Sequence, residues 1–218
     1  MWKSFVSLSL MLFLLSCSWF RVERPEVPPE KQMSSWVSLF DGKNLDENWV
    51  VMGDSGGWSI TESGVIRSEG GRNGNWLRSR NLYKDFALRL QYRVAPGGNS
   101  GVFIRCSDEG NPWETGYECQ ISNEQPPRDD LHCTGSLYGY VPANPRPNEA
   151  PDVWHTCEII CRNNRIKVII DGTETVDVQQ DQVPEIRNKP LSGYIGLQDS
   201  HTEEGYWVEF RNIRIREL

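Results

Sequence analysis

The sequence predicts an all-β protein built as a sandwich of two antiparallel sheets. Short runs rich in Val, Ile, Phe, Tyr and Trp alternate along the chain with Gly, Asn, Asp and Pro. This is the pattern of strands separated by turns. A helix is hard to find in the sequence, because the apolar residues do not recur with helical spacing. Many short strands joined by regular turns favour a two-sheet sandwich over a parallel α/β sheet.

Eleven runs carry the β-branched and aromatic residues that favour strands. In chain order they are 36–40, 57–61, 65–68, 75–79, 86–94, 101–106, 117–122, 154–162, 165–170, 193–198 and 208–216. Asn163 and Asn164 tolerate positive φ and predict a tight hairpin, and Asp171 with Gly172 predicts a further turn. The longest break, residues 124–151, is rich in Pro and Asn. Long loops in compact domains are often functional.

The first 16 residues have the layout of a signal peptide. One cation, Lys3, precedes an apolar run over residues 5–15, which is too short to span a bilayer comfortably. The letters L-L-S-C that end at Cys17 resemble a bacterial lipobox, so we expect cleavage before Cys17 and lipid on its sulfur. The alternative is an ordinary secretory signal whose cysteine is incidental. No other segment is apolar enough to cross a membrane.

A tether and one domain follow the predicted anchor. Residues 17–34 carry several prolines among charges, a composition that favours extended conformations. Residues 35–218 are enough for one domain with a substantial core. The protein is therefore expected to be exported and held by lipid at the bacterial cell envelope, on its periplasmic or outer-membrane side.

The charge of the chain excludes some partners. The formal net charge is −7, and removal of the predicted signal peptide takes away one cation, Lys3, to leave −8. An acidic chain without a basic block argues against binding to nucleic acid and against electrostatic docking on membranes. The lipid is then the only expected contact with the membrane.

Five cysteines remain after the lipidated one: Cys106, Cys119, Cys133, Cys157 and Cys161. An exported protein can keep disulfides, but an odd number leaves at least one thiol free, and the sequence does not fix a pairing. The alternative is that they are small buried hydrophobic residues. A zinc site is not expected, because no C-x-x-C pair is present and the histidines are only His132, His155 and His201.

Two neighbouring strands carry an unusual set of polar side chains. Because successive side chains of a strand point to opposite faces, Asn99, Phe103 and Arg105 are expected on one face of the first. Glu118 and Gln120 are expected on one face of the second, with Cys106 and Cys119 on the apolar faces. An amide, a carboxylate, a guanidinium and a ring together are costly to bury without partners. Such a surface suits a polar, ring-shaped ligand such as a sugar.

Sequence motifs along the whole domain resemble the 3-keto-disaccharide hydrolase family of bacteria. They are W-V-S-L-F-D-G-K-N-L at 36–45, G-W-S-I at 57–60, G-G-N-S-G-V-F-I-R at 97–105, G-Y-E-C-Q-I-S-N at 116–123, T-G-S-L-Y-G at 134–139, V-W-H-T-C-E-I at 153–159, G-Y-I-G-L-Q-D at 193–199 and V-E-F-R-N-I-R-I at 208–215. The resemblance implies a concanavalin A-like jelly-roll sandwich. It also implies an enzyme that cleaves the glycosidic bond of 3-keto-disaccharides or 3-keto-glucosides.

The chain departs from the family pattern at two positions. Asn123 stands where the family commonly has Asp, and His155 stands where it commonly has Asn. Asn123 cannot ionise, whereas His155 adds a titratable group. The sequence also lacks the E-x-D-x-E strand of retaining glucanases, so a mechanism with two close carboxylates is not supported.

The chemistry that the family implies needs a base, an acid and groups that stabilise an oxyanion. A ketone at C3 of a sugar acidifies the hydrogen on C2, so that proton abstraction, elimination of the C1 substituent and hydration cleave the bond. We expect Glu118 to be the base or a metal ligand and Arg105 to support the oxyanion or orient Glu118. The alternative is a cross-strand ion pair that only stabilises the sheet. His132, Asp199 and His201 are further candidates for acid or base.

The expected substrate contacts come from amides and rings. Asn99, Gln120 and Gln198 are candidates for bonding sugar hydroxyls, and Tyr138 and Phe103 for stacking on a ring. For Phe103 packing in the core is the preferred alternative, and Trp36, Trp49, Trp58, Trp76 and Trp154 are expected in the core.

Two open questions concern a metal and the class of protein. A divalent ion is possible, with Glu118 and Asp199 as oxygen ligands. The alternative to an enzyme is a non-catalytic carbohydrate-binding module tethered to the envelope.

Overall fold

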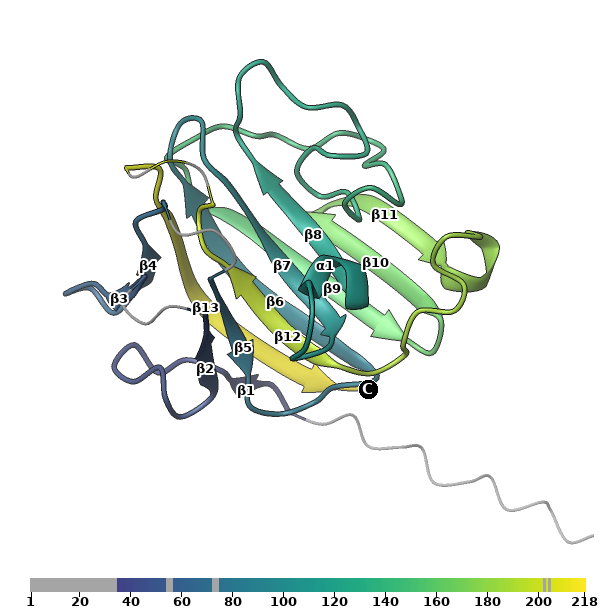
Figure 1. Cartoon of the computed structure of the whole chain (residues 1–218), viewed down its shortest axis with the longest axis horizontal. Coiled ribbons are helices and arrows are strands. Elements are labelled where there is room, and N and C mark those ends of the chain that lie inside the picture. Colours follow the sequence, from purple (N-terminus) through teal and green to yellow (C-terminus); the bar gives the residue numbers. More distant parts are fainter. Residues whose placement is uncertain (1–34, 54–56, 72–74, 202, 204) are drawn as a thin grey trace, which may run out of the picture. The chain divides into compact units, whose positions relative to one another are not determined.

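A computed structural model describes residues 35–53, 57–71, 75–201, 203 and 205–218. The predicted signal peptide, Cys17 and the tether lie outside these residues and stay predictions. The described chain forms two antiparallel sheets packed face to face, which confirms the all-β sandwich (Figure 1). No helix among the described residues is long and apolar enough to cross a membrane.

The larger sheet has eight strands. Its order is β11-β10-β9-β6-β13-β4-β3, with β1 paired to β13. The bounds are β1 (Val37–Ser38), β3 (Trp58–Ile60), β4 (Ile66–Ser68), β6 (Phe86–Val94), β9 (His155–Arg162), β10 (Arg165–Ile170), β11 (Thr173–Gln179) and β13 (Val208–Glu217). The Asn163–Asn164 hairpin joins β9 to β10 as predicted, and Asn163 adopts a positive φ of 52°.

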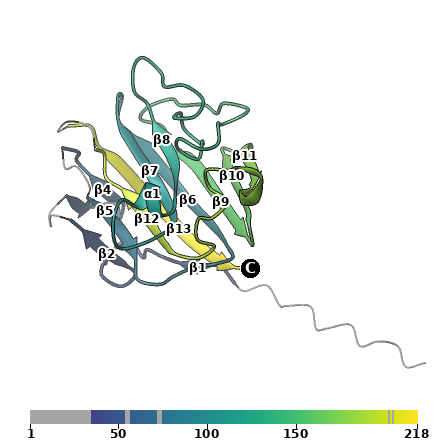
Figure 2. The ribbon, with the colours of Figure 1, turned by 45° about the vertical axis from the view of Figure 1, so that its right-hand side comes forward.

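The smaller sheet has five strands in the order β2-β5-β12-β7-β8. The bounds are β2 (Trp49–Met52), β5 (Trp76–Ser79), β7 (Asn99–Cys106), β8 (Tyr117–Ser122) and β12 (Tyr194–Gln198). A four-residue helix, α1 (Pro112–Thr115), connects β7 to β8 and lies over the face of this sheet (Figures 1 and 2). A 3₁₀ turn, Gln180–Gln182, follows β11.

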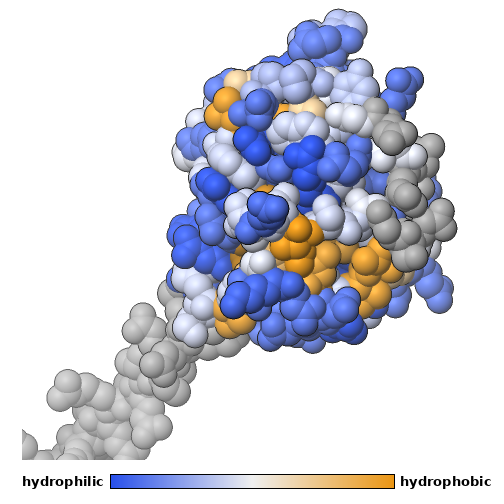
Figure 3. Space-filling model, turned by 90° about the vertical axis from the view of Figure 1, so that its left-hand side faces the viewer, coloured by the Kyte–Doolittle hydropathy of each residue, from blue (hydrophilic) through white to orange (hydrophobic). Residues whose placement is uncertain are grey.

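The core lies between the sheets. Leu88 and Ile159 of the larger sheet and Val102 and Leu197 of the smaller sheet are fully buried in one hydrophobic cluster. Burial of such a side chain stabilises the fold by roughly 1.5–3 kcal/mol. Outside this core the described surface is mainly polar. Figure 3 shows one such side, where most hydrophobic residues gather in the lower part and a few lie near the top.

All eleven predicted strands are present, but two strands and α1 were not predicted. In β11 the sequence T-E-T-V-D-V-Q is polar, because this strand lies at the edge of the sheet and is exposed at several positions. In β2 the run W-V-V-M is short and also forms an edge. Edge strands bury little surface, so the hydrophobic pattern that signals a strand is weak in β11.

The five described cysteines are free and buried. Cys119 of β8 and Cys157 of β9 come from opposite sheets and both lie in the inter-sheet core. The Cys157 thiol and burial raise the pKa of Cys119 well above its usual range. Strand alternation predicted Cys106 on the core-facing side of its strand. This prediction is wrong, because Cys106 packs with Trp76 and Phe103 on the other side of the sheet.

Candidate functional site

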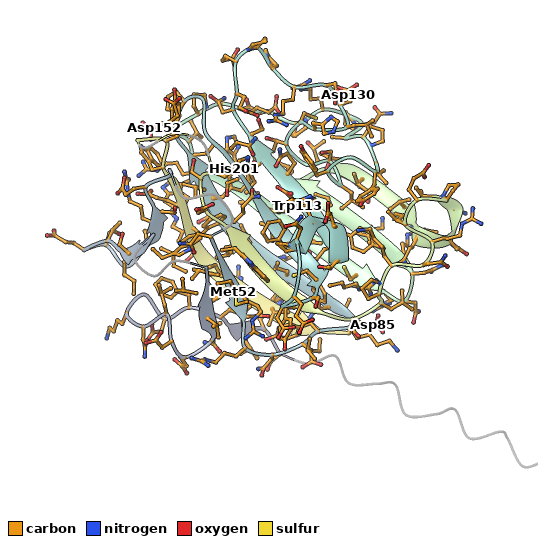
Figure 4. The ribbon with its side chains drawn as sticks, in the orientation of Figure 1. Met52, Asp85, Trp113, Asp130, Asp152 and His201 are labelled. Atoms are coloured by element: carbon orange, nitrogen blue, oxygen red, sulfur yellow. The ribbon has the colours of Figure 1, made fainter. Side chains whose placement is uncertain are left out.

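A cavity of about 410 Å³ opens on the outer face of the smaller sheet. Eight of the ten predicted site residues line it: Asn99, Phe103, Glu118, Gln120, Tyr138, Gln198, Asp199 and His201. The other lining residues were not predicted as site residues: Asn75, Trp76, Gly110, Asn111, Pro112 and Trp113. Figure 4 shows Trp113 of α1 and His201, which follows β12, on the same side of the smaller sheet. The cavity therefore collects residues from four strands, from α1 and from several loops.

The pairing of β7 with β8 places the central polar residues. In this register Phe103 lies opposite Glu118, and Gly101 lies opposite Gln120. The missing side chain of Gly101 makes room for the acid, because a Cβ on this glycine would lie 2.8 Å from Cγ of Glu118. Gly101 is thus part of the site although it carries no functional group.

Glu118 is an acid of the cavity whose pKa is strongly raised. Its side chain is buried, with 3% of its surface exposed, and no ion pair within the described residues neutralises it. Burial raises the pKa of Glu118 from 4.5 to about 8, and the positive charge of Arg128 opposes that rise. Glu118 is therefore mostly protonated at neutral pH and can donate a proton.

His201 provides the complementary group. Its backbone N–H donates to the Asn99 carbonyl oxygen at 3.2 Å, which holds the segment after β12 beside β7. Burial lowers the pKa of His201, so the imidazole is neutral at neutral pH. Its Nδ1 atom is buried and has no hydrogen-bond partner among the described residues. A neutral imidazole of this kind can accept a proton.

Arg105 does not lie where the strand pattern predicted. It adopts a positive φ of 53° at a bulge, where the pairing of β12 with β7 shifts register. The bulge turns its fully buried side chain away from the cavity, so that its Nη2 atom donates to the Lys84 carbonyl oxygen at 2.8 Å and lies 3.6 Å from Asp85. The predicted placement of Arg105 beside Glu118 is therefore wrong, because the bulge breaks the two-residue alternation.

Arg128 supplies the cation that Arg105 was expected to supply. It forms an ion pair with Glu124, and its Nη1 atom lies 3.4 Å from the Tyr138 hydroxyl. Glu124 in turn accepts a hydrogen bond from the Asn99 side chain at 2.8 Å. The sequence did not reveal Arg128 because it lies in the long 124–151 segment, where no strand register fixes the direction of a side chain.

His132 lies at the rim and does not line the cavity. Its Nδ1 atom is 2.7 Å from Oδ1 of Asp129, and its ring packs edge-on against Tyr138 with 4.8 Å between the centroids. This places His132 behind Tyr138 as a neighbour of the site.

Asn123 and His155, the two departures from the family pattern, both form hydrogen bonds outside the cavity. Asn123 accepts a hydrogen bond from the Gly97 backbone at 3.1 Å and donates to the Glu149 carbonyl oxygen. His155 lies 2.6 Å from Asp171 through Nδ1, and its ring stacks on Tyr92. Neither residue lines the cavity. Their hydrogen bonds instead connect the ends of strands to neighbouring loops.

Aromatic rings form the end of the cavity near α1. Trp76 and Phe103 meet edge-on with 5.6 Å between their centroids, and Trp113 packs against this cluster. Gly196 of β12 allows the arrangement, because a Cβ there would lie 2.5 Å from the Trp76 ring. Trp76 was expected in the core, but it lines the cavity, as does Phe103, which was a candidate for stacking on a ring with core packing as the preferred alternative.

Two observations bear on alternative sites. Glu118 and Asp199 line the same cavity, but no group of three His, Cys, Asp or Glu side chains among the described residues is placed to hold a metal ion. A larger groove of about 820 Å³ lies on the outer face of the larger sheet. There Arg89 pairs with Glu158 at 3.0 Å, and Arg214 also lines the groove. The smaller cavity is the better candidate, because it contains two ionisable groups whose pKa values burial shifts, Glu118 and His201.

The fold and site define a member of a known sugar-acting family. Residues 35–216 match the family described as the 3-keto-alpha-glucoside-1,2-lyase-like domain, and the chain belongs to it. It is similar to a 3-keto-disaccharide hydrolase of Bacteroides thetaiotaomicron, with 26% identity over an alignment that covers 84% of this chain and 78% of the relative.

Solved structures agree with this assignment. A candidate glycosyl hydrolase from Parabacteroides distasonis is 27% identical, with a TM-score of 0.73 over 84% of this chain and all of that chain. A β-glucanase from Bacillus licheniformis is 14% identical, with a TM-score of 0.54 over 87% of this chain and all of that chain. The second likeness shows the jelly-roll fold alone.

The raised pKa of Glu118 predicts a pH-dependent stability. Because the folded state holds this proton up to about pH 8 and the unfolded state releases it near 4.5, Glu118 destabilises the fold progressively as pH rises between these values. Glu118→Gln should therefore raise the free energy of unfolding, by on the order of 3 kcal/mol at pH 7 and by little below pH 4.5. Denaturant unfolding of both proteins from pH 4 to pH 9 measures the difference.

The matched control is Glu158→Gln, since Glu158 lies on the outer face of the larger sheet and pairs with Arg89. Its unfolding curve should show no such gain. If the difference in free energy of unfolding between Glu118→Gln and wild type stays constant with pH, the raised pKa of Glu118 is contradicted.

Proposed function

We propose that this protein cleaves the glycosidic bond of 3-keto-disaccharides or 3-keto-glucosides. The observation that carries the proposal is the pairing, in one cavity, of a carboxyl group with a raised pKa and a neutral imidazole with an unpartnered nitrogen. Family membership and the name of the Bacteroides relative support the substrate class. The aromatic and amide lining suits a sugar ring.

The reaction begins at C2 of the oxidised sugar. The C3 ketone acidifies the C2 hydrogen, and neutral His201, which lines the cavity, is the proposed group that removes it as a proton. The electrons move into an enediolate whose negative charge lies on the C3 oxygen. Side-chain amides of Asn99 and Gln120 are the nearby donors that stabilise such an oxyanion. His201 is therefore the proposed base, in place of Glu118.

The second half of the reaction releases the leaving group. As the enediolate collapses, the C1–O bond breaks, and Glu118 donates its proton to the departing oxygen. Water then adds to C1 and gives a proton to the Glu118 carboxylate, while His201 returns its proton to C2, which yields free 3-keto-glucose from a 3-keto-glucoside and restores both groups. Glu118 fits this role because a protonated carboxylic acid is what burial favours here.

A direct assay separates this enzyme from a binding module. The domain of residues 35–218 is expected to release 3-keto-glucose from 3-keto-trehalose and to leave trehalose intact, because trehalose has no acidified C2 hydrogen. Chromatography of the products after incubation with each sugar measures this. Equal turnover of trehalose would contradict the C2 mechanism. Binding of 3-keto-trehalose without any product would support the binding module and overturn the proposal.

Hydrogen exchange at C2 separates the two roles. In D₂O the Glu118→Gln variant should still exchange the C2 hydrogen of 3-keto-trehalose, while its cleavage rate falls by roughly 10²–10⁴-fold. His201→Gln should lose both exchange and cleavage, because it lacks the base. NMR of the C2 position and product assays give the two rates. A His201→Gln variant that exchanges C2 as fast as wild type would show that another group is the base.

A further inference from the structure

We propose that α1 and the rings beside it form a subsite for the leaving group of the substrate, and that Lys189 holds this subsite in place. The inference rests on the proposed function, because it states on which side of Glu118 the departing half of a 3-keto-glycoside lies. The chemistry that fits is a leaving group with an apolar ring face, such as a second pyranose.

The cavity has two chemically different ends along β7. Asn99 begins this strand, and the backbone of His201 bonds to it at 3.2 Å, so the proposed base lies at this polar end. Phe103 lies four residues further along, about 13 Å away at the usual strand rise. There it meets Trp76 and Trp113, so the end next to α1 is aromatic.

Glu118 lies between these ends. Glu118 pairs with Phe103 in the sheet, but its side chain leans over Gly101, midway between Asn99 and Phe103, where a Cβ would lie 3.0 Å from the carboxyl carbon of Glu118. A general acid must face the glycosidic oxygen, while the base must face C2 of the oxidised ring. The oxidised ring therefore occupies the polar end beside His201. The leaving group extends past Glu118 over the aromatic end.

Trp113 forms the outer wall of this end and depends on α1. A helix of four residues does not hold itself, because nearly all of its backbone groups lack partners inside it. Lys189, far along the chain, donates hydrogen bonds to backbone carbonyl oxygens of α1 and of the residue after it. Its Nζ atom donates to the carbonyl oxygens of Trp113 at 3.3 Å, Glu114 at 2.5 Å and Gly116 at 2.5 Å.

Aromatic rings secure the Lys189 ammonium group. Nζ lies 5.3 Å from the centroid of the Tyr117 ring and 4.5 Å from that of Tyr140. The faces of these rings attract the cation, and so do the carbonyl oxygens at the C-terminal end of the helix. Lys189 is thus a positioning residue that ties Trp113 to the body of the domain.

Substrates that differ only in the leaving group test the subsite. Trp113→Ala should raise KM for 3-keto-trehalose by about tenfold, the usual scale of a lost ring contact, and leave KM for methyl 3-keto-α-glucoside unchanged. Lys189→Met should shift KM in the same selective way, severalfold, since Trp113 is retained but no longer held. Initial rates with both substrates give KM and kcat for each protein.

Matched controls keep the result interpretable. Trp154→Ala and Lys167→Met change the same residue types at the other sheet, where Arg211 covers Trp154 and Glu174 pairs with Lys167. Neither should change the ratio of the two KM values. Thermal unfolding of each variant checks that the fold is kept.

The outcomes separate this inference from the function on which it rests. If wild-type protein cleaves neither substrate, the proposed function is wrong and the subsite with it. If wild-type protein cleaves both, and Trp113→Ala and Lys189→Met change the two KM values equally, only the subsite is wrong. A selective rise in KM for 3-keto-trehalose in both variants supports the subsite.

Discussion

The burial of one carboxyl group, that of Glu118, is the constraint on which the rest of the site depends. The register of β7 and β8 sets Glu118 opposite Phe103, and the neighbouring glycine, Gly101, leaves space for the acid. Without an ion-pair partner among the described residues, the buried carboxyl group keeps its proton to about pH 8. This burial lowers the stability of the fold at neutral pH, and it leaves a proton donor in the same cavity as a neutral imidazole.

The site shows how far strand alternation can be followed from sequence. Period-2 counting correctly placed Asn99, Phe103, Glu118 and Gln120 on one face, because β7 and β8 are regular over these positions. The same counting failed at Arg105, where a bulge inserts an extra residue. A bulge depends on tertiary packing, and nothing in the letters around Arg105 signals it.

Other parts of the site could not be predicted because they depend on loops. Trp113 and Arg128 reach the cavity or its rim from α1 and from the 124–151 segment. Both segments are held by distant contacts, such as the bonds from Lys189 to α1. The sandwich itself was predictable, because its strands carry the hydrophobic pattern that buries a core.

Infrared spectroscopy of the Glu118 carboxyl group tests the central claim most directly. The difference between wild-type protein and Glu118→Gln isolates the C=O stretch of the protonated acid. We expect this band at pH 6 and its loss with a midpoint near pH 8, where burial sets the pKa. A midpoint near 4.5 would show that Glu118 is an ordinary solvated carboxylate, and would contradict its role as the proton donor.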